Sequence, residues 1–289
     1  MNSNPELKKR SQWEDVWIRY KKNKVALISL FVFIIFILIV IFADLIVPYQ
    51  TALQQNLRVR LLPPSAAHWL GTDDFGRDLF ARIIHGTRIS IFIGLAVTAV
   101  SSILGVIIGA ASGYYGKWFD SLTMRILDVI MTFPGILLII TLVSFFGIGM
   151  TNKIFAMSIA GLPGYARMVR GSVLSIKEIE YIEAARAIGC NDVIIMFKHI
   201  VPNVIGPIII NAALSMSGVI IAAAGLSFIG FGVQSPTPEW GAIMSSAKQY
   251  MRTAQYFILI PGLFIVTSTL VLTLIGDGLV DALDPRLRN

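Results

Sequence analysis

The sequence is poor in charge, in cysteine and in histidine. Only 14% of its 289 residues are charged, against about 25% in soluble globular domains. The single cysteine, Cys190, excludes a disulfide within the chain. The three histidines, His68, His85 and His199, are scattered and suggest no metal site. With 55% hydrophobic residues, this composition indicates an integral membrane protein.

The sequence also lacks a phosphate-cradling loop and a catalytic constellation. The nearest approach to a Walker A loop, residues 111–118, has neither the first glycine nor the Ser or Thr that binds magnesium. No Ser–His–Asp arrangement can be proposed. We therefore expect no enzyme activity, no cofactor and no ATP hydrolysis in this chain. The net charge of +7 does not require a nucleic acid, because Lys and Arg in membrane proteins gather on cytoplasmic segments.

Six runs with few or no charges predict an all-α fold of six transmembrane helices. A helix needs about 20 mostly apolar residues to cross the bilayer core. The fourth run is short, and it spans only if its ends extend while Arg167 and Arg170 reach toward the interface. The fifth run is long enough for one span and a partly inserted loop. The runs are residues 25–43, 89–116, 129–152, 154–166, 200–238 and 253–276.

The distribution of basic residues predicts that both termini are cytoplasmic. With that topology, two thirds of the 24 Lys and Arg residues lie on inner segments. The predicted order is an inner N-terminal segment, a first transmembrane helix, an outer loop with an interfacial helix, a core of five helices containing an inner loop at 175–203, and an inner tail. These parts are residues 1–24, 25–47, 48–88, 89–282 and 283–289.

The N-terminal segment combines basic and aromatic residues. Trp13, Trp17 and Tyr20 recur at helical spacing, which suits an amphipathic helix on the inner leaflet. Anchoring by positive charge is the simpler explanation of the basic residues there, ahead of a specific lipid or partner.

Two outer segments are candidates for an outer gate or for contact with an outside partner. Residues 72–88 predict an interfacial helix capped by Thr72 or Asp73, in which Asp78 and Arg82 pair across one turn. A structural role for this helix is an equal alternative. Residues 231–252 are rich in turn formers, and Trp240 would serve equally as an interfacial anchor. The candidate residues are Arg77, Asp78, Pro236, Pro238 and Trp240.

The inner loop at 175–203 predicts a helix, a sharp turn and a second helix. Ser175 and Glu178 form a capping-box pattern that would start a helix near residue 176. Gly189 suits the left-handed position after the first helix, Asn191 caps the second helix, and Pro202 would end it. Apolar residues lie on several sides of the first helix, so we interpret it as a docking element. An ordinary loop helix packed on its own protein is the alternative.

The loop and seven other segments resemble one family. Glu183-Ala184-Ala185, followed by Gly189 and Ile200-Val201-Pro202, resembles the EAA loop of binding-protein-dependent ABC importer permeases, with Val201 where that pattern has leucine. The wider match is to the C-type subunits of dipeptide and oligopeptide permeases, over about residues 10–288. It is carried by residues 69–78, 88–90, 131–134, 165–167, 226–228, 236–241 and 276–288.

The resemblance implies a type I ABC importer permease fold in a bacterial cytoplasmic (inner) membrane. It implies pairing with a homologous B-type permease, two cytoplasmic ATPases that bind ATP and Mg, and an extracytoplasmic solute-binding protein. The EAA segment would be the cytoplasmic coupling helix that seats in an ATPase. The residues expected to couple are Tyr181, Glu183, Ala184, Ala185, Arg186, Gly189 and Pro202.

Two other classes of function fit the sequence less well. A self-powered carrier usually places acidic or His relays near the membrane midplane, whereas Asp44 and Asp128 lie near predicted helix ends. An intramembrane enzyme would need a catalytic cluster within the spans. The resemblance favours di- or oligopeptides as substrate and leaves nickel complexes, glutathione and other small solutes open.

The transport path is expected between this chain and its partner, along the second to sixth spans. The first span should be peripheral, because Ser29 is the only polar residue in its apolar run. Gly105 and Gly109 form a G-x-x-x-G pattern that suits close helix packing.

Overall fold

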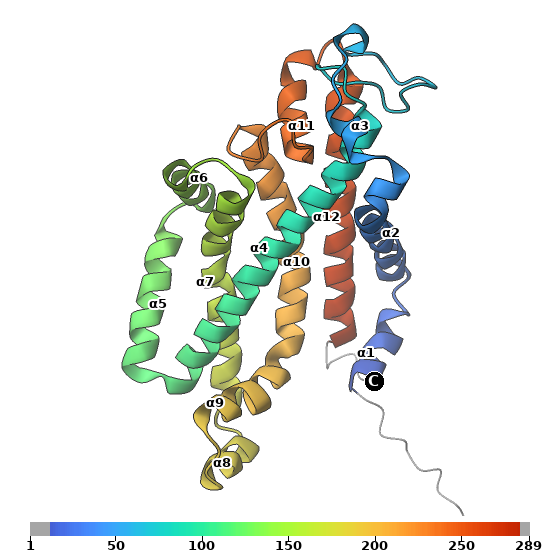
Figure 1. Ribbon diagram of the computed structural model, residues 1–289. Coiled ribbons are helices and arrows are strands. Elements are labelled where there is room, and N and C mark those ends of the chain that lie inside the picture. Colours follow the sequence, from blue (N-terminus) through green and yellow to red (C-terminus); the bar gives the residue numbers. More distant parts are fainter. Residues whose placement is uncertain (1–11, 284–289) are drawn as a thin grey trace, which may run out of the picture.

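The computed structural model describes residues 12–283, and this part of the chain is built from helices and connecting turns. Long helices stand roughly side by side, and short helices cover both ends of the bundle (Figure 1). The elements are α1 (Gln12–Tyr20), α2 (Lys24–Ile46), α3 (Tyr49–Leu53), η1 (Leu57–Val59), α4 (Leu79–Tyr115), α5 (Lys117–Thr132), α6 (Gly135–Phe146), α7 (Met150–Ile176), α8 (Glu180–Ala187), α9 (Asp192–Ile194), η2 (Ile195–Ile200), α10 (Val201–Phe228), α11 (Trp240–Ala247), η3 (Lys248–Tyr250) and α12 (Gln255–Leu283).

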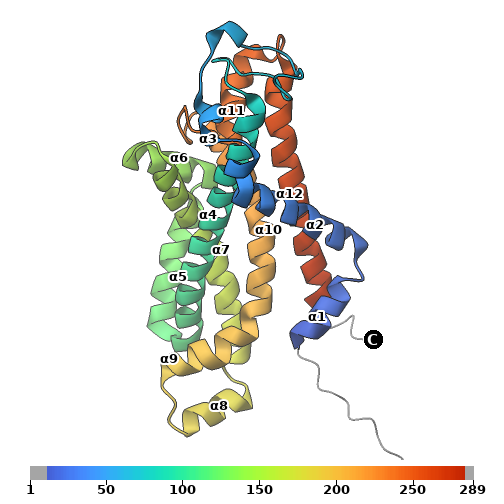
Figure 2. The same cartoon turned by 45° about the vertical axis from the view of Figure 1, so that its right-hand side comes forward.

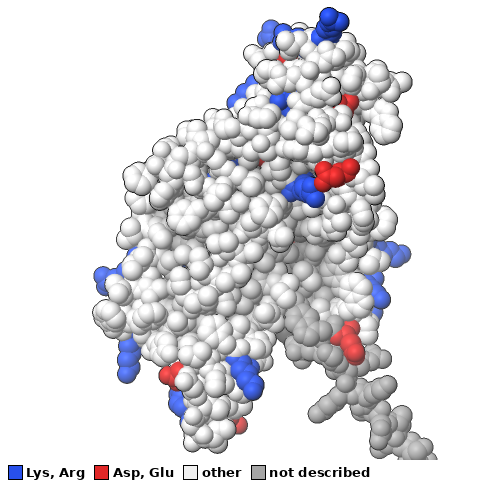
Figure 3. Space-filling view, viewed as in Figure 1, with Lys and Arg blue, Asp and Glu red and all other residues white. Residues whose placement is uncertain are grey.

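Four helices in the described part of the chain are long and apolar enough to cross a membrane. They are α2, α4, the continuous helix from Asp192 to Phe228, and α12; counting α5 and α6 as one bent span raises the number to five. The remaining predicted span corresponds to α7, which is 27 residues long and carries Lys153, Arg167 and Arg170. The count of six therefore stays a prediction. Charged side chains gather toward the two ends of the molecule and leave a broad, nearly uncharged band between them (Figure 3).

The predicted interfacial helix at 72–88 is not a separate element. Residues 72–78 form turns, and α4 then runs without a break from Leu79 to Tyr115. The N-cap is Asp78, whose carboxylate accepts a hydrogen bond from the Ala81 amide at 2.9 Å, so the predicted caps at Thr72 and Asp73 were wrong. A continuous helix forms because the stretch beyond Asp78 contains no proline.

The predicted third span is broken in two. Helices α5 and α6 meet at an angle of 91°, with Phe133 in an extended conformation just before Pro134. A residue before proline is driven away from helical geometry, which explains a break at this place. Two ion pairs then fasten α5 to α7: Arg170 to Asp120 at 2.5 Å, and Arg167 to Asp128.

Close packing of α4 on α7 depends on small residues, as the G-x-x-x-G pattern predicts. A Cβ atom added to Gly105 would lie 2.3 Å from the Tyr165 Cβ, and one added to Gly109 would lie 2.4 Å from the Ala166 carbonyl oxygen. These two glycines let the helix backbones approach each other. Helix α4 crosses both α7 and α10, so it ties the two halves of the bundle together.

Helix α2 lies at the edge of the bundle, where it contacts α12 and α4 (Figures 1 and 2). Its buried stripe includes Ser29 and Phe36, and its other side is exposed and apolar. Near the start of α2, the Asn23 amide donates to the Asp281 carboxylate at 3.1 Å. This contact places the start of α2 and the end of α12 at the same end of the molecule. Of the predicted N-terminal and C-terminal segments, residues 1–11 and 284–289 lie outside the described residues.

Candidate functional site

The inner loop projects from the end of the bundle that also carries α1 and the end of α12 (Figure 2). Helix α7 continues through Ile176, and α8 begins only at Glu180 after a short turn. The Ile179 N-cap makes no side-chain capping bond, and Ser175 donates back to the Ser172 carbonyl. The predicted capping box between Ser175 and Glu178 was therefore wrong, because α7 already includes Ser175.

The predicted left-handed glycine is confirmed. Gly189 has φ +83°, its amide donates to the Arg186 carbonyl, and the Cys190 amide donates to the Ala185 carbonyl at 3.1 Å. These two bonds are the Schellman arrangement that ends a helix at a left-handed residue. A Cβ atom on Gly189 would meet nothing within 4 Å. The position therefore favours glycine for its backbone conformation and not for space.

The second helix of the loop does not end at Pro202. Asn191 caps it as predicted, by accepting from the Val193 amide at 2.9 Å. The chain then stays helical from Asp192 to Phe228 through a π-helical turn at Ile195–Ile200. The prediction that Pro202 ends the helix was wrong, because Pro202 follows the π-helical turn and the helix continues through it into α10.

One face of α8 packs on the chain itself and the other face is uncovered. Ile182 is fully buried and Ala185 is 7% exposed, in one cluster with Val169 and Ile200. Ile188 is 81% exposed. The alternative of a loop helix packed on its own protein is therefore confirmed for the face that carries Ile182 and Ala185, and docking by the exposed face stays a prediction. The other exposed residues of α8 and of the turn after it are Glu180, Tyr181, Glu183, Ala184, Arg186, Ala187 and Gly189.

The exposed acidic and basic residues of α8 differ in their contacts. The Arg186 guanidinium lies over the Tyr114 ring at 5.6 Å, and a hydrogen bond with Tyr114 raises the pKa of Arg186. The Tyr114 hydroxyl also donates to Asp192 at 2.6 Å. No ion pair within residues 12–283 involves Glu183. Arg186 therefore braces the loop against the end of α4, whereas Glu183 is exposed and has no ion-pair partner among the described residues.

Further exposed apolar residues lie in the loop and in its second helix. They are Ile179, Ile188, Val193, Ile194 and Phe197, which are 44%, 81%, 52%, 48% and 45% exposed.

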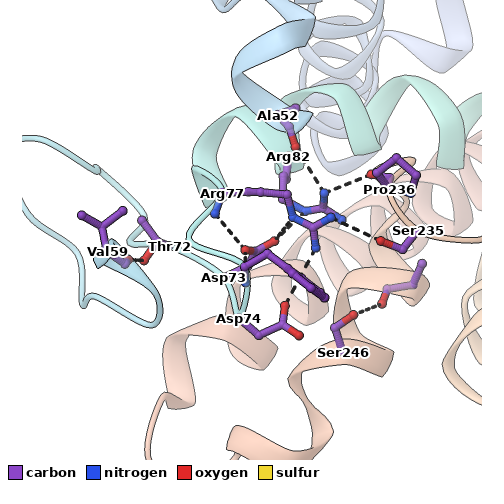
Figure 4. A network of polar contacts seen from close by, with 12 residues as sticks. Ala52, Val59, Thr72, Asp73, Asp74, Arg77, Arg82, Ser235, Pro236 and Ser246 are labelled. Atoms are coloured by element: carbon purple, nitrogen blue, oxygen red, sulfur yellow. Dashed lines mark hydrogen bonds and ion pairs between the residues drawn. The ribbon is translucent and has the colours of Figure 1, made fainter. Parts of the chain in front are cut away.

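At the opposite end of the molecule, charged residues are buried and paired. Asp73 lies between Arg77 and Arg82 (Figure 4). One Asp73 oxygen accepts from the Arg77 Nε at 2.6 Å, and the Arg82 Nε lies 3.3 Å from the same oxygen without hydrogen-bond alignment. Burial, and next the charge of Asp73, raise the pKa of Asp74. A buried pair of this kind is costly to break from one side.

The arginines also connect this network to distant segments. The Arg82 Nη1 donates to the carbonyls of Ala52 at 3.2 Å and Pro236 at 3.1 Å. The Arg77 Nη1 donates to the Ser235 hydroxyl at 3.3 Å. The network therefore joins the outer loop, the start of α4 and the segment before α11.

Most of the predicted outer contact residues are not available for contact. Arg77 is 1% exposed, Trp240 is fully buried against Phe36 and Phe264, and Pro238 is also buried. Burial speaks against a surface contact for these three residues, and their predicted part in an outer gate stays a prediction; the interfacial anchor at Trp240 was wrong, because its side chain is fully buried. Asp78 pairs with His68 at 2.8 Å in place of the expected Arg82. Of the five candidates, only Pro236 is exposed.

Sequence reasoning missed a second buried charge at this end. Lys153, expected on an outer loop, is fully buried; its Nζ donates to the Ser227 Oγ at 2.7 Å and lies 4.0 Å from the Glu239 Oε1. The Glu239 carboxylate also caps α11, by accepting from the amides of Gly241 and Ala242. An isolated lysine flanked by two apolar runs was the available signal, but its partners are far away in the sequence.

Comparisons with known proteins place the chain among transport permeases. The family model described as "binding-protein-dependent transport system inner membrane component" matches residues 101–289. The model described as "N-terminal TM domain of oligopeptide transport permease C" matches residues 11–64.

Two curated relatives match nearly the whole chain. A dipeptide transport system permease protein of Alkalihalophilus pseudofirmus is 43% identical over 96% of this chain and 91% of that protein. A glutathione transport system permease protein of Pectobacterium atrosepticum is 41% identical over 97% of this chain and 93% of that protein.

A solved structure shares the fold. A chain of the MetNI methionine ABC transporter, in an inward-facing conformation, superposes with a TM-score of 0.52 at 22% identity and covers 69% of this chain and 94% of that chain. The likeness is evidence for the type I importer permease fold alone.

Proposed function

The chain belongs to the family of binding-protein-dependent transport system inner membrane components, and on this premise we propose that it moves di- or oligopeptides as one of two permease subunits of an ATP-driven importer. Both permease subunits would be homologous, and their shared interface would hold the transport path. Two ATPase subunits would bind ATP and Mg, and an outer solute-binding protein would deliver the peptide.

The observation that carries this proposal is the uncovered face of α8. It belongs to a helix that is fixed from behind by Ile182 and Ala185, and it presents Glu183 and Ile188 outward. A helix that is packed on the permease by one face can transmit the movement of a partner bound to its other face, whereas a flexible loop cannot. We therefore assign this face to contact with an ATPase, which supplies the motion that opens and closes the path.

The orientation of the chain in the membrane follows from the same assignment. Helix α8 lies at the same end as α1 and the end of α12 (Figures 1 and 2). If ATPases dock there, that end and both termini are cytoplasmic, and the buried Asp73 network lies on the outer side. The chain would then be a multi-pass protein of a bacterial inner membrane.

Peptide is the substrate class that the relatives favour. One relative carries the name of a dipeptide permease and another that of a glutathione permease. Glutathione is itself a small peptide, so an amide-containing backbone is the chemistry common to both substrates. Glutathione is therefore the second candidate.

The test is uptake by the reconstituted importer. The complex of this chain, its partner permease, both ATPases and the binding protein, in proteoliposomes, should import radiolabelled dialanine and hydrolyse ATP faster when the peptide-loaded binding protein is added. The same complex should be assayed with labelled glutathione. Import of neither compound would overturn the peptide proposal.

A labelling experiment tests the sidedness. In a Cys190→Ala background, a cysteine introduced by Glu183→Cys should react with a membrane-impermeant maleimide only after the cells are opened. Strong labelling in intact spheroplasts would contradict both the topology and ATPase docking at α8.

A further inference from the structure

A small cavity lined by both apolar and polar residues lies among the middle parts of α4, α7 and α10. Its volume is about 180 Å³. Each of the three helices contributes lining residues near its centre, well away from both the buried Asp73 network and the α8 loop. The lining includes Thr98, Ser101, Gly164, Tyr165, Asn211 and Ser215.

One buried hydroxyl at this cavity has no partner. Thr98 is 6% exposed, and its side-chain oxygen has no hydrogen bond within residues 12–283. Tyr165 is 3% exposed, and its hydroxyl interacts with Ser215, another residue of the lining. The neighbouring Ser101, by contrast, donates to the Ser158 carbonyl at 3.1 Å. Buried polar groups are nearly always hydrogen-bonded, so an unpaired hydroxyl at a cavity points to a ligand or to water.

The polar side chains that line the cavity can form hydrogen bonds and carry no charge. The lining contains hydroxyls and the Asn211 amide, which both donate and accept, and it contains no Asp, Glu, Lys, Arg or His. A peptide bond likewise offers one N–H donor and one C=O acceptor. A set of neutral donors and acceptors matches that group whatever side chains the peptide carries.

The volume shows that this chain supplies only part of a site. Pockets that bind small ligands usually measure about 300–1,000 Å³, and this cavity is smaller. Its lining includes Gly161 and Gly164, which are exposed residues of α7. Between them, Pro163 lies inside the helix. A second wall from a homologous permease would complete the space.

From these observations we propose that the cavity is this chain's half of a midmembrane subsite that binds the backbone amide of a peptide in transit. The inference rests on the proposed function, because it takes peptides as the transported class. It identifies which residues of this chain line the path and which group of the peptide they bind. Thr98, Tyr165 and Asn211 hydrogen-bond the backbone, and Gly164 keeps the entrance open.

The first test fills the entrance. A Cβ atom on Gly164 would meet nothing within 4 Å, and the same is true of Gly171, two turns further along α7 and outside the lining. Gly164→Leu should therefore leave packing intact and obstruct the cavity. In the reconstituted importer, dialanine uptake should fall at least about tenfold while ATP hydrolysis stimulated by the loaded binding protein continues. Gly171→Leu is the matched control and should transport at the wild-type rate.

The second test removes one unpaired hydroxyl without changing shape. Thr98→Val should lower dialanine uptake about two- to tenfold, as expected for one lost hydrogen bond, and should leave thermal stability equal or higher. Thr269→Val is the control, because the Thr269 hydroxyl bonds only to carbonyls of its own helix and lies outside the cavity. The loss should be the same for dialanine, alanyl-glutamate and alanyl-lysine, because their backbones are identical.

The outcomes separate the subsite from the proposed function. Wild-type peptide uptake in both Gly164→Leu and Thr98→Val would show that the cavity holds water only, and the inference would fail while the importer assignment stood. A loss that varied with the charge of the peptide side chain would also overturn it. Absence of peptide uptake by the wild-type complex would instead overturn the proposed function, and peptide as the ligand with it.

Discussion

The two ends of the molecule carry similar residues in opposite states. At the end that we propose is the outer one, Asp73 and Arg77 are at most 1% exposed and bonded to each other. At the end that we propose is the inner one, Glu183 and Arg186 are exposed, and the apolar Ile188 beside them is 81% exposed. Each segment also contains a glycine with positive φ, Gly76 or Gly189. Burial distinguishes the two ends: the buried charges hold segments of the fold together, whereas the exposed face of α8 is the one that we propose binds an ATPase.

The largest effect should follow from breaking the outer network. Asp73→Ala would leave Arg77 and Arg82 buried without their shared carboxylate, at a cost of about 3–5 kcal/mol in the free energy of unfolding. Thermal unfolding of the purified chain in detergent measures this. Asp74→Ala is the control, because the Asp74 carboxylate lies 3.8 Å from Arg77 without a hydrogen bond, and it should cost clearly less. Equal stability of Asp73→Ala and wild type would contradict the structural role.

Removing the charge of Glu183 at the inner end should weaken coupling to the ATPase and leave the stability of the fold unchanged. Glu183→Ala should unfold like wild type, because the side chain is exposed and unpaired within the described residues. If the carboxylate contacts a desolvated donor on an ATPase, docking should weaken by about 2–4 kcal/mol. Substrate-stimulated ATP hydrolysis by the reconstituted importer is the measurement, with the exposed Glu178→Ala as control. Full stimulation in Glu183→Ala would make α8 an ordinary connector.

The close contact between α4 and α7 should tolerate no larger side chain at its glycines. Gly109→Leu would bring a Cβ atom to 2.4 Å from the Ala166 carbonyl oxygen, and overpacking of this kind costs about 1–3 kcal/mol. Thermal unfolding should show the loss. Gly218→Leu is a suitable control on α10, since nothing lies within 4 Å of its added Cβ. Similar stability of the two variants would mean that the helices can separate freely.

A smaller effect is expected from the turn that ends α8. Gly189→Val should cost about 1–2 kcal/mol, because a β-branched residue resists the left-handed conformation that Gly189 adopts at φ +83°. The turn should then shift, and stimulated ATP hydrolysis should fall while α7 and α10 stay folded. Gly189→Asn should restore activity, since asparagine tolerates this conformation. If asparagine and valine behave alike, the backbone explanation is wrong.

The smallest effect is expected from an ion pair whose two side chains are exposed. Arg88 and Asp44 lie 2.9 Å apart with side chains 47% and 59% exposed. A double-mutant cycle with Arg88→Ala and Asp44→Ala should give a coupling energy of about 0.2–1 kcal/mol in unfolding experiments. A value as large as that of the Asp73 network would show that burial is not what separates strong charge pairs from weak ones here.

Features that depend on neighbours in the sequence were predicted correctly. The positive φ at Gly189 and the cap at Asn191 depend on the backbone conformation of a single turn. The packing role of Gly105 and Gly109 depends on the absence of a side chain. The edge position of α2 also follows from local composition, because a helix that is apolar on nearly all sides can face lipid.

Predictions failed where the answer depended on distant residues. Trp240 and Lys153 read as surface residues in the sequence, but they are buried by Phe264 and by Ser227 with Glu239. The break at Pro134 had a local signal in the residue before proline, yet the apolar run that crosses it indicated one continuous span. Pro202 looked like a helix end, and the π-helical turn before it keeps the helix continuous.

The sequence by itself determined that this chain is helical, lies in a membrane and carries the loop motif of a recognisable permease family, because hydropathy and turn chemistry act over a few residues at a time. Only the tertiary structure decided which charged residues are exposed. It buried Arg77 against Asp73, left Glu183 exposed, and gathered Thr98, Tyr165 and Asn211 from three helices around one cavity. The physical reason is that burial is a property of how helices pack against one another, and no single segment contains that information.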